Sequence, residues 1–360
     1  MLIVIAIIAI LAAAMAYAVG GAQESAKVAK TRAIIAKLHT LVSQKYESYR
    51  NRRLPIAIPP TVIDPATGGA IATPPRAIAK LRCDALRALI KMEMPERWTD
   101  VVDDPAKSPI KIVKPGAPRS DPTKWTPYGD VTNPSRAATV TMQRPAASQA
   151  YLAFFNSLGA FNATSLESDG NQGAKCLYLL VTKGLDEPDV LENFSDSEIG
   201  DPDHSGCKVF LDAWGNPIRF LRWAPGLVSS LQPAGPSAAE HDLRMPDPTD
   251  PAGIYYAPKP GSIAARGPGR AMGNTFALYP LIYSAGADGH YDILSTGYSG
   301  GVPFHYSQTK PPNNPFETVW NAPAYPYGPI GAAVVDSADR ETRTALANAD
   351  NITNHDIGAR

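Results

Sequence analysis

Residues 2–19 read LIVIAIIAILAAAMAYAV, a run of eighteen residues without a charged side chain. As a helix rising 1.5 Å per residue, the run is about 27 Å long, close to the hydrocarbon thickness of a bilayer. A helix that is apolar on every side must lie in lipid or be packed on all sides by similar helices. The stretch of about residues 2–20 therefore predicts a transmembrane segment.

The helical pattern continues beyond this segment. No proline occurs from Ala22 to Arg53, and most of the basic residues there leave one face free for apolar side chains. Steps of three and four residues, typical of an amphipathic helix, separate Val28, Ile34, Ile35, Leu38, Leu41, Val42, Tyr46 and Tyr49. Leu54-Pro55 ends the run, because the residue before a proline avoids the helical conformation. Residues 1–53 thus predict one helix, roughly 80 Å long, whose second half lies on a globular body.

Other interpretations of the N-terminal run stay open at this point. Ala16-Tyr17-Ala18 satisfies the small-x-small cleavage pattern of a secretory signal, although no basic region precedes the apolar run and the helix continues past the site. A generic single-span anchor fits equally well. Residues 21–53 carry eight Lys or Arg and two Glu, a bias that favours the cytoplasmic side and leaves the orientation in the membrane undecided.

Composition limits the function classes. The 34 basic and 34 acidic residues balance, which argues against nucleic acid as a partner. The 35 prolines among 360 residues are roughly twice the usual share and predict many loops. Cys83, Cys176 and Cys207 are too widely spaced for a zinc site. We take Cys176 with Cys207 as the first candidate for a disulfide.

The remaining chain divides into two parts. Residues 54–145 predict a proline-rich connector with one helix at about 77–95 and an irregular, surface-exposed stretch over 103–145. Residues 146–360 predict a globular α+β domain with a C-terminal tail. Its expected helices are 147–158 and 174–183, and its expected strands are 208–212, 218–223, 275–283 and 291–294. The predicted fold class is therefore α+β: a long N-terminal helix packed on a small antiparallel sheet, with extra helices and long proline-rich loops.

Two short motifs stand out in the globular part. Residues 212–220 read DAWGNPIRF, in which Gly215-Asn216-Pro217 makes a tight turn before a strand. We interpret it as a hairpin corner held by a buried Trp214. Residues 284–289 read SAGADG, a glycine-rich turn. The simplest interpretation of both patterns is a turn that binds no metal.

Together, these stretches resemble one family. LIVIAIIAILAA at residues 2–13 resembles the hydrophobic N-terminus of type IV pilins and type II secretion pseudopilins. The two motifs resemble the D-x-WG-x-P and S-x-G-x-DG segments of the major pseudopilin, in the same order. The resemblance covers the first fifty residues and roughly 208–294. The proline-rich insertions have no counterpart in it.

The resemblance implies a prepilin N-terminal motif: a basic leader ending in glycine, a methylated Phe or Met, and Thr-Leu-x-Glu before the apolar run. Met1 falls immediately after that glutamate, so we expect the leader and the glutamate upstream of Met1. In the family the glutamate pairs with a neighbour's N-terminal amine. A chain without it is expected to insert into the membrane but to assemble poorly.

The resemblance also implies a site, partners and a location. The family's S-x-G-x-DG loop binds calcium, which takes oxygen ligands, so Ser284, Asp288 and Asp292 are the expected Ca²⁺ ligands. The expected partners are the chain itself or other pilin-like subunits through the N-terminal helix, together with the secretion or pilus assembly machinery. The expected location is the inner membrane, crossed once, with the C-terminal domain in the periplasm or outside the cell.

Three further patterns are weaker. Residues 201–206, DPDHSG, loosely match a calcium loop but lack its glutamate. Residues 297–301, GYSGG, match the G-x-S-x-G elbow of serine hydrolases without the helix that should follow. Residues 351–355, NITNH, predict only a capped or docked tail. We therefore expect a structural protein rather than an enzyme, with a single-span exported binding protein as the alternative and an exported hydrolase as a more distant one.

Overall fold

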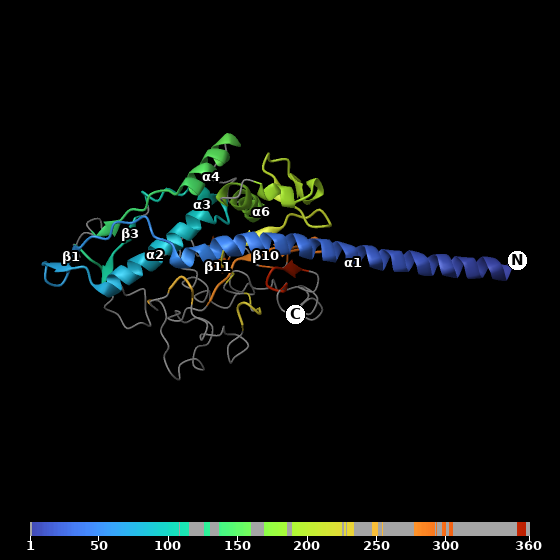
Figure 1. Cartoon of the computed structure of the whole chain (residues 1–360), viewed down its shortest axis with the longest axis horizontal. Helices are drawn as coiled ribbons and strands as arrows, with labels where there is room; N and C mark the ends of the chain where they lie inside the picture. Colours follow the sequence, from blue (N-terminus) through green and yellow to red (C-terminus); the bar gives the residue numbers. More distant parts are fainter. Residues whose placement is uncertain are drawn as a thin grey trace.

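A long N-terminal helix, α1 (Leu2–Ser48), projects from a head of mixed helix and sheet (Figure 1). It contains 47 residues, which makes it about 70 Å long, and it ends in the 3₁₀ turn η1 (Tyr49–Asn51). The computed structural model describes residues 2–107, 109–114, 126–129, 137–159, 169–185, 189–224, 227, 229–233, 247–250, 254, 277–291, 293, 297–299, 302–304 and 351–357. The helix α1 confirms the predicted long helix.

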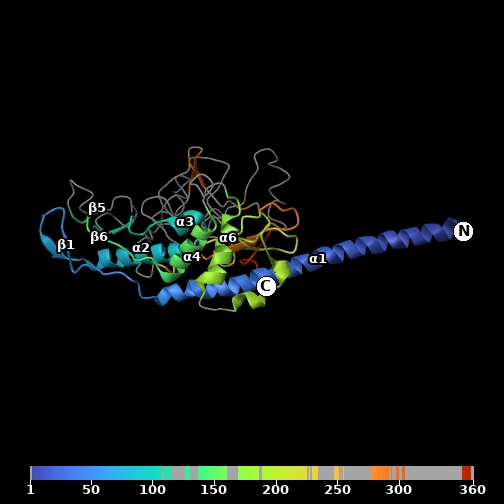
Figure 2. The same ribbon diagram turned by 90° about the horizontal axis from the view of Figure 1, so that it is seen from above.

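The helix α1 has two halves with different surroundings. Every side chain from Ile3 to Gln23 is exposed. Farther along, one stripe is buried: Thr31, Ile34, Ile35, Leu38, Val42, Tyr46 and Tyr49. Figure 2 shows α2, α4 and α6 gathered along this second half, while the N-terminal half extends alone. The predicted amphipathic stripe is confirmed.

The bare half of α1 is strongly apolar. Its most apolar 18-residue window has a mean hydropathy of 2.6, and none of that window is buried. Among the described residues, this helix is the one that is long and apolar enough to cross a membrane.

A small antiparallel sheet lies against the buried stripe of α1 (Figure 1). Its strand order is β13 (Ile352–Thr353), β10 (Leu281–Ser284), β9 (Arg219–Leu221). The register places Ile282 opposite Phe220 and Ser284 opposite Ile352. The fold is thus mixed helix and antiparallel sheet, as predicted, and the NITNH tail supplies an edge strand of this sheet.

The strands differ from the predicted bounds. The strand predicted over 208–212 is β8 (Val209–Phe210), which pairs with β7 (Ile199–Gly200) rather than with β9. The strand predicted over 275–283 begins at Leu281 within the described residues. Residues 292 and 294 of the predicted strand 291–294 lie outside the described part of the chain.

The connector is more ordered than predicted. It contains the hairpin β1 (Thr61–Ile63) and β2 (Ala70–Ala72), the helix α2 (Pro75–Glu93) and the short helix α3 (Trp98–Val102). Two ladders follow: β3 (Ile110–Lys111) with β6 (Thr139–Val140), and β4 (Val113–Lys114) with β5 (Thr126–Pro127). The expectation of an irregular surface stretch over 103–145 is wrong for these residues, because buried side chains anchor the ladders to the core: Ile110, Ile112, Tyr128, Val140 and Met142.

The remaining helices lie close to their predicted bounds. The helix α4 (Ala146–Ser157) matches the predicted 147–158. The helix α6 (Gln172–Leu179) continues into the π-helical turn η4 (Leu180–Gly184), which together match the predicted 174–183. Two 3₁₀ turns, η5 (Val190–Asn193) and η6 (Asp196–Glu198), lead to β7.

The predicted disulfide is wrong. Cys83, Cys176 and Cys207 are all free thiols and all buried. Cys176 and Cys207 belong to one apolar cluster with Trp98 and Tyr151. Burial raises the pKa of the Cys207 thiol to about 12, so both sulfurs serve as small apolar groups in this cluster.

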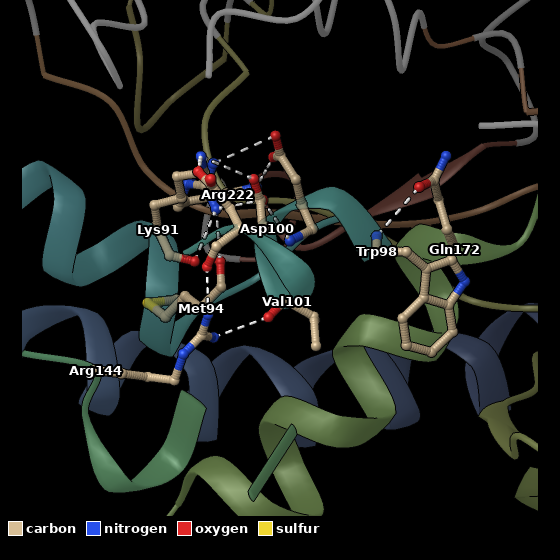
Figure 3. A network of polar contacts seen from close by, with 10 residues as sticks. Lys91, Met94, Trp98, Asp100, Val101, Arg144, Gln172 and Arg222 are labelled. Atoms are coloured by element: carbon tan, nitrogen blue, oxygen red, sulfur yellow. Dashed lines mark hydrogen bonds and ion pairs between the residues drawn. The ribbon is translucent and has the colours of Figure 1, made fainter. Parts of the chain in front are cut away.

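A buried polar network joins the connector to the sheet (Figure 3). The Arg222 guanidinium, which follows β9 and is fully buried, donates at 2.9 Å to the Asp100 carboxylate and at 2.9 Å to the Met94 carbonyl. The Arg222 amide donates to the Glu96 carboxylate at 2.8 Å. Nearby, Arg144 donates to the Val101 carbonyl at 2.9 Å. The loop between α2 and α3 is therefore fixed to the end of β9.

Candidate functional site

The DAWGNP segment folds as a turn around the Asp212 carboxylate. Asp212 Oδ1 accepts hydrogen bonds from the amides of Trp214, at 2.9 Å, and Asn216, at 2.8 Å. Gly215 has a φ of 92°, a conformation that side chains with a Cβ rarely adopt. Asp212 is buried, so its charge is balanced by these donors inside the fold.

The same carboxylate connects the two sequence motifs. Its other oxygen, Oδ2, accepts a hydrogen bond from the Ser284 hydroxyl at 2.7 Å. The Asn216 side-chain amide donates to the Gly286 carbonyl at 3.1 Å. Residues 212–217 and 284–289 are thus one structural unit, which we call the motif junction.

The motif junction docks on α1. The Trp214 indole donates to the Glu24 carboxylate at 2.7 Å, and the Ala213 amide donates to the Thr31 hydroxyl at 3.0 Å. Thr31 is the first buried residue of α1. The motif junction therefore lies where the helix leaves the head, at the boundary between its bare and docked halves. The predicted hairpin corner is present, although Trp214 is only partly buried.

Tyr291 contacts the last residue of the turn, Pro217. The Tyr291 hydroxyl donates to the Pro217 carbonyl at 2.5 Å. The Arg219 guanidinium stacks on the Tyr291 ring, 3.4 Å from its centroid. Burial raises the pKa of Tyr291 to about 12, so the phenol keeps its proton and acts as a donor at neutral pH.

The structure describes two of the three predicted calcium ligands, and their surroundings differ. Ser284 is fully buried and its hydroxyl is used by Asp212. Asp288 is exposed and accepts a hydrogen bond from the His290 amide at 2.8 Å. Asp292 lies outside the described residues. Within the described part of the chain, no group of three or more His, Cys, Asp or Glu side chains converges as a metal site, and calcium binding stays a prediction.

The second loop considered for calcium, residues 201–206, holds a lysine. Lys175 Nζ lies 2.7 Å from Asp203 Oδ2 and 2.9 Å from Asp169 Oδ2. The Asp201 carboxylate accepts hydrogen bonds from the amides of Ser205 and Gly206. Burial opposes the charge of Asp203, but the hydrogen bonds from Lys175 and Ser205 hold its pKa well below the usual range. The Asp203 carboxylate is therefore already paired with an ammonium group.

The G-x-S-x-G segment does not form a nucleophile elbow. Residues 297–299 are the strand β11 (Gly297–Ser299), which pairs antiparallel with β12 (Val302–Phe304), so that Ser299 faces Val302 in a hairpin. A nucleophile elbow requires a turn from a strand into a helix. His305 lies outside the described residues.

Asp212 and Asn354 organise this region, a role that the sequence motifs containing them did not predict. Asp212 is the hub, and its position two residues before Trp214 and four before Asn216 is the signal of an Asx-type turn. Asn354 acts through its side chain. Its Oδ1 atom accepts a hydrogen bond from the Ile282 amide at 2.7 Å, and its Nδ2 atom donates to the Pro280 carbonyl at 3.0 Å. That role depends on a contact between distant segments, which no local pattern reveals.

Comparisons with known proteins add no family to this picture. No protein-family model, curated protein or solved structure matches the chain.

Proposed function

We propose that this chain is a structural subunit of a pilin-like or type II secretion pseudopilus filament, held in the inner membrane by the first half of α1 before assembly. The observation that carries the proposal is the division of α1. Its residues 3–23 are bare and its stripe from Thr31 to Tyr49 is covered by the head. A subunit that packs through its N-terminal helix needs both halves.

The mechanism is assembly. A helix that is apolar on every side is stable in lipid or among similar helices, so subunits leave the bilayer by packing their bare halves against one another. The head then faces outward, in the periplasm or outside the cell. The hydrogen bonds of the motif junction to Glu24 and Thr31 keep the helix at a fixed angle to the head. No catalytic step is involved.

Membrane anchoring is tested by one substitution with a matched control. Ile10 is 68% exposed and touches no part of the head, so Ile10→Lys leaves the head folded. A lysine near the middle of a span costs about 2.5–3.5 kcal/mol of insertion free energy. We expect the unmodified chain to stay in the membrane pellet after alkaline carbonate extraction and Ile10→Lys to be released. The control, Gln23→Lys, should stay in the pellet.

Assembly is tested separately, with a chain that carries a prepilin leader, Phe and Thr-Leu-Val-Glu before Met1, in cells that overproduce a compatible pilus or pseudopilus assembly system. A filament subunit is recovered in the fraction sheared from the cell surface. Recovery only in the membrane, together with a positive carbonate result, supports the alternative, a single-span exported binding protein that does not polymerise. Release of the unmodified chain by carbonate contradicts both functions.

A further inference from the structure

A cavity of about 950 Å³ opens beside the far end of α1. It lies between the end of α1, helix α2, the start of α4 and the turn η4. Figure 2 shows α2 and α4 beside the second half of α1. The volume is within the range of small-molecule sites in proteins. Apolar walls come from Leu41, Leu89 and Leu185.

The cavity carries a surplus of positive charge. Four basic side chains line it, Lys45, Arg52, Arg53 and Lys183, against one acidic side chain, Glu93. This leaves a formal charge of +3 in a partly enclosed space, where electrostatic attraction is stronger than on an open surface.

Glu93 is already satisfied within the fold. Arg52 forms a two-pronged pair with it, at 2.5 Å and 2.6 Å. Lys45 Nζ lies 3.3 Å from the same carboxylate, and the Tyr49 hydroxyl donates to it at 2.8 Å. The glutamate therefore neutralises about one of the two cations that it holds in place, and it orients them along the cavity wall.

The other two cations have no acidic partner among the described residues. Arg53 is exposed at the rim. Lys183 is exposed as well, and its ammonium group lies 5.5 Å from the centroid of the Phe154 ring. The amino end of α4 adds to the same potential: Pro145, Ala146 and Ala147 line the cavity, and no acidic residue lies in the first turn of the helix.

We propose that this cavity binds a small, multiply charged organic or inorganic anion, through carboxylate or phosphate groups held by Arg53, Lys183, Lys45 and Arg52. The site goes beyond the proposed filament function and does not depend on it. Leu41 is about 21 residues beyond the apolar run, or about 30 Å along the helix. A bilayer that holds residues 2–20 therefore cannot present its lipid headgroups to the cavity, which points to a soluble anion.

The test is isothermal titration of the full chain in non-ionic detergent with citrate and, separately, with inorganic pyrophosphate. Sodium chloride at 0.15 M screens weak surface attraction. We expect saturable 1:1 binding of at least one of the two probes, with a dissociation constant below about 1 mM. The two probes distinguish carboxylate from phosphate recognition. No saturable binding of either probe overturns the proposal.

Two variants and a control locate the site. Arg53→Ala with Lys183→Ala removes exposed cations without uncovering Glu93. It should weaken binding about tenfold or more, because the anion loses two charge-assisted hydrogen-bond donors. Ala150→Trp fills the cavity without a change of charge and should weaken binding as well. Lys27→Ala with Arg32→Ala, exposed residues outside the cavity, makes the same charge change and should leave binding intact. Equal losses in the control pair and the cavity pair would show general charge attraction and overturn the site.

Discussion

The central role of Asp212 leads to a sharp prediction about stability. Asp212→Ala removes the acceptor for three hydrogen bonds of 2.7–2.9 Å, donated by the Trp214 amide, the Asn216 amide and the Ser284 hydroxyl. Hydrogen bonds to a charged group contribute about 1.5–3 kcal/mol each, and their sum is not additive. We therefore expect a loss of about 3–5 kcal/mol in the free energy of unfolding.

The assay is thermal unfolding of the full chain in non-ionic detergent, followed by circular dichroism. A loss of 3–5 kcal/mol should lower Tm by at least about 6 °C, at about 2 °C per kcal/mol for a large domain. Asp212→Asn is the matched control: it keeps the Oδ1 acceptor for the turn, and should cost about 1–2 kcal/mol.

A double-mutant cycle with Ser284→Ala isolates the link between the two motifs. The hydrogen bond of 2.7 Å from the Ser284 hydroxyl to the Asp212 carboxylate should appear as a coupling free energy of about 1–2 kcal/mol between the two residues. A cost below about 1 kcal/mol for Asp212→Ala, or strictly additive effects in the cycle, would refute the motif junction as a unit of stability.

Buried groups elsewhere in the head and the calcium loop give four more tests. Arg222→Met should cost about 3–5 kcal/mol in thermal unfolding, because it removes the guanidinium that donates to the buried Asp100 carboxylate at 2.9 Å and lies 3.5 Å from the buried Glu96 carboxylate. A neutral effect would contradict the network in Figure 3. Burial lowers the pKa of His355 from 6.5 to about 4. The unfolded chain therefore binds the proton first as pH falls, and the free energy of unfolding should drop by about 3 kcal/mol between pH 6.5 and 4. In denaturation experiments at stepped pH, His355→Gln should show a smaller drop over this range. The three buried thiols should not react with a thiol reagent in the native chain and should react, three per chain, after unfolding. The calcium prediction expects Tm to rise with added calcium relative to chelator, and Asp288→Asn to remove the rise; identical melting curves for the unmodified chain would reject it.

The long helix and its buried stripe were predictable because their pattern is local. Ile34, Leu38 and Val42 repeat at four-residue steps, and the structure buries each of them. Residues 2–19 are apolar throughout, so no register has to be chosen. The helices α2 and α4 were predictable for the same reason, with bounds set by prolines at Pro74 and Pro145.

The contacts that build the site were not predictable, because they join distant segments. Asp212 and Ser284 are 72 residues apart, and the strand β13 pairs with β10 from near the end of the chain. Lys175 resembles an ordinary surface lysine in the sequence, yet it is buried and pairs with Asp203 of the 201–206 loop. Local patterns located both motifs but could not show that one carboxylate holds them together.

In the proposed filament, the bare half of α1 packs against the same half of other subunits. The most direct measurement is photo-cross-linking from a benzoylphenylalanine at Ile7, which is exposed on that half. The chain should carry a prepilin leader, Phe and Thr-Leu-Val-Glu before Met1 and be expressed in cells with an assembly system. We predict a ladder of cross-linked multimers, weaker without the added leader. A chain with the leader that yields only monomer and lipid adducts would contradict the account.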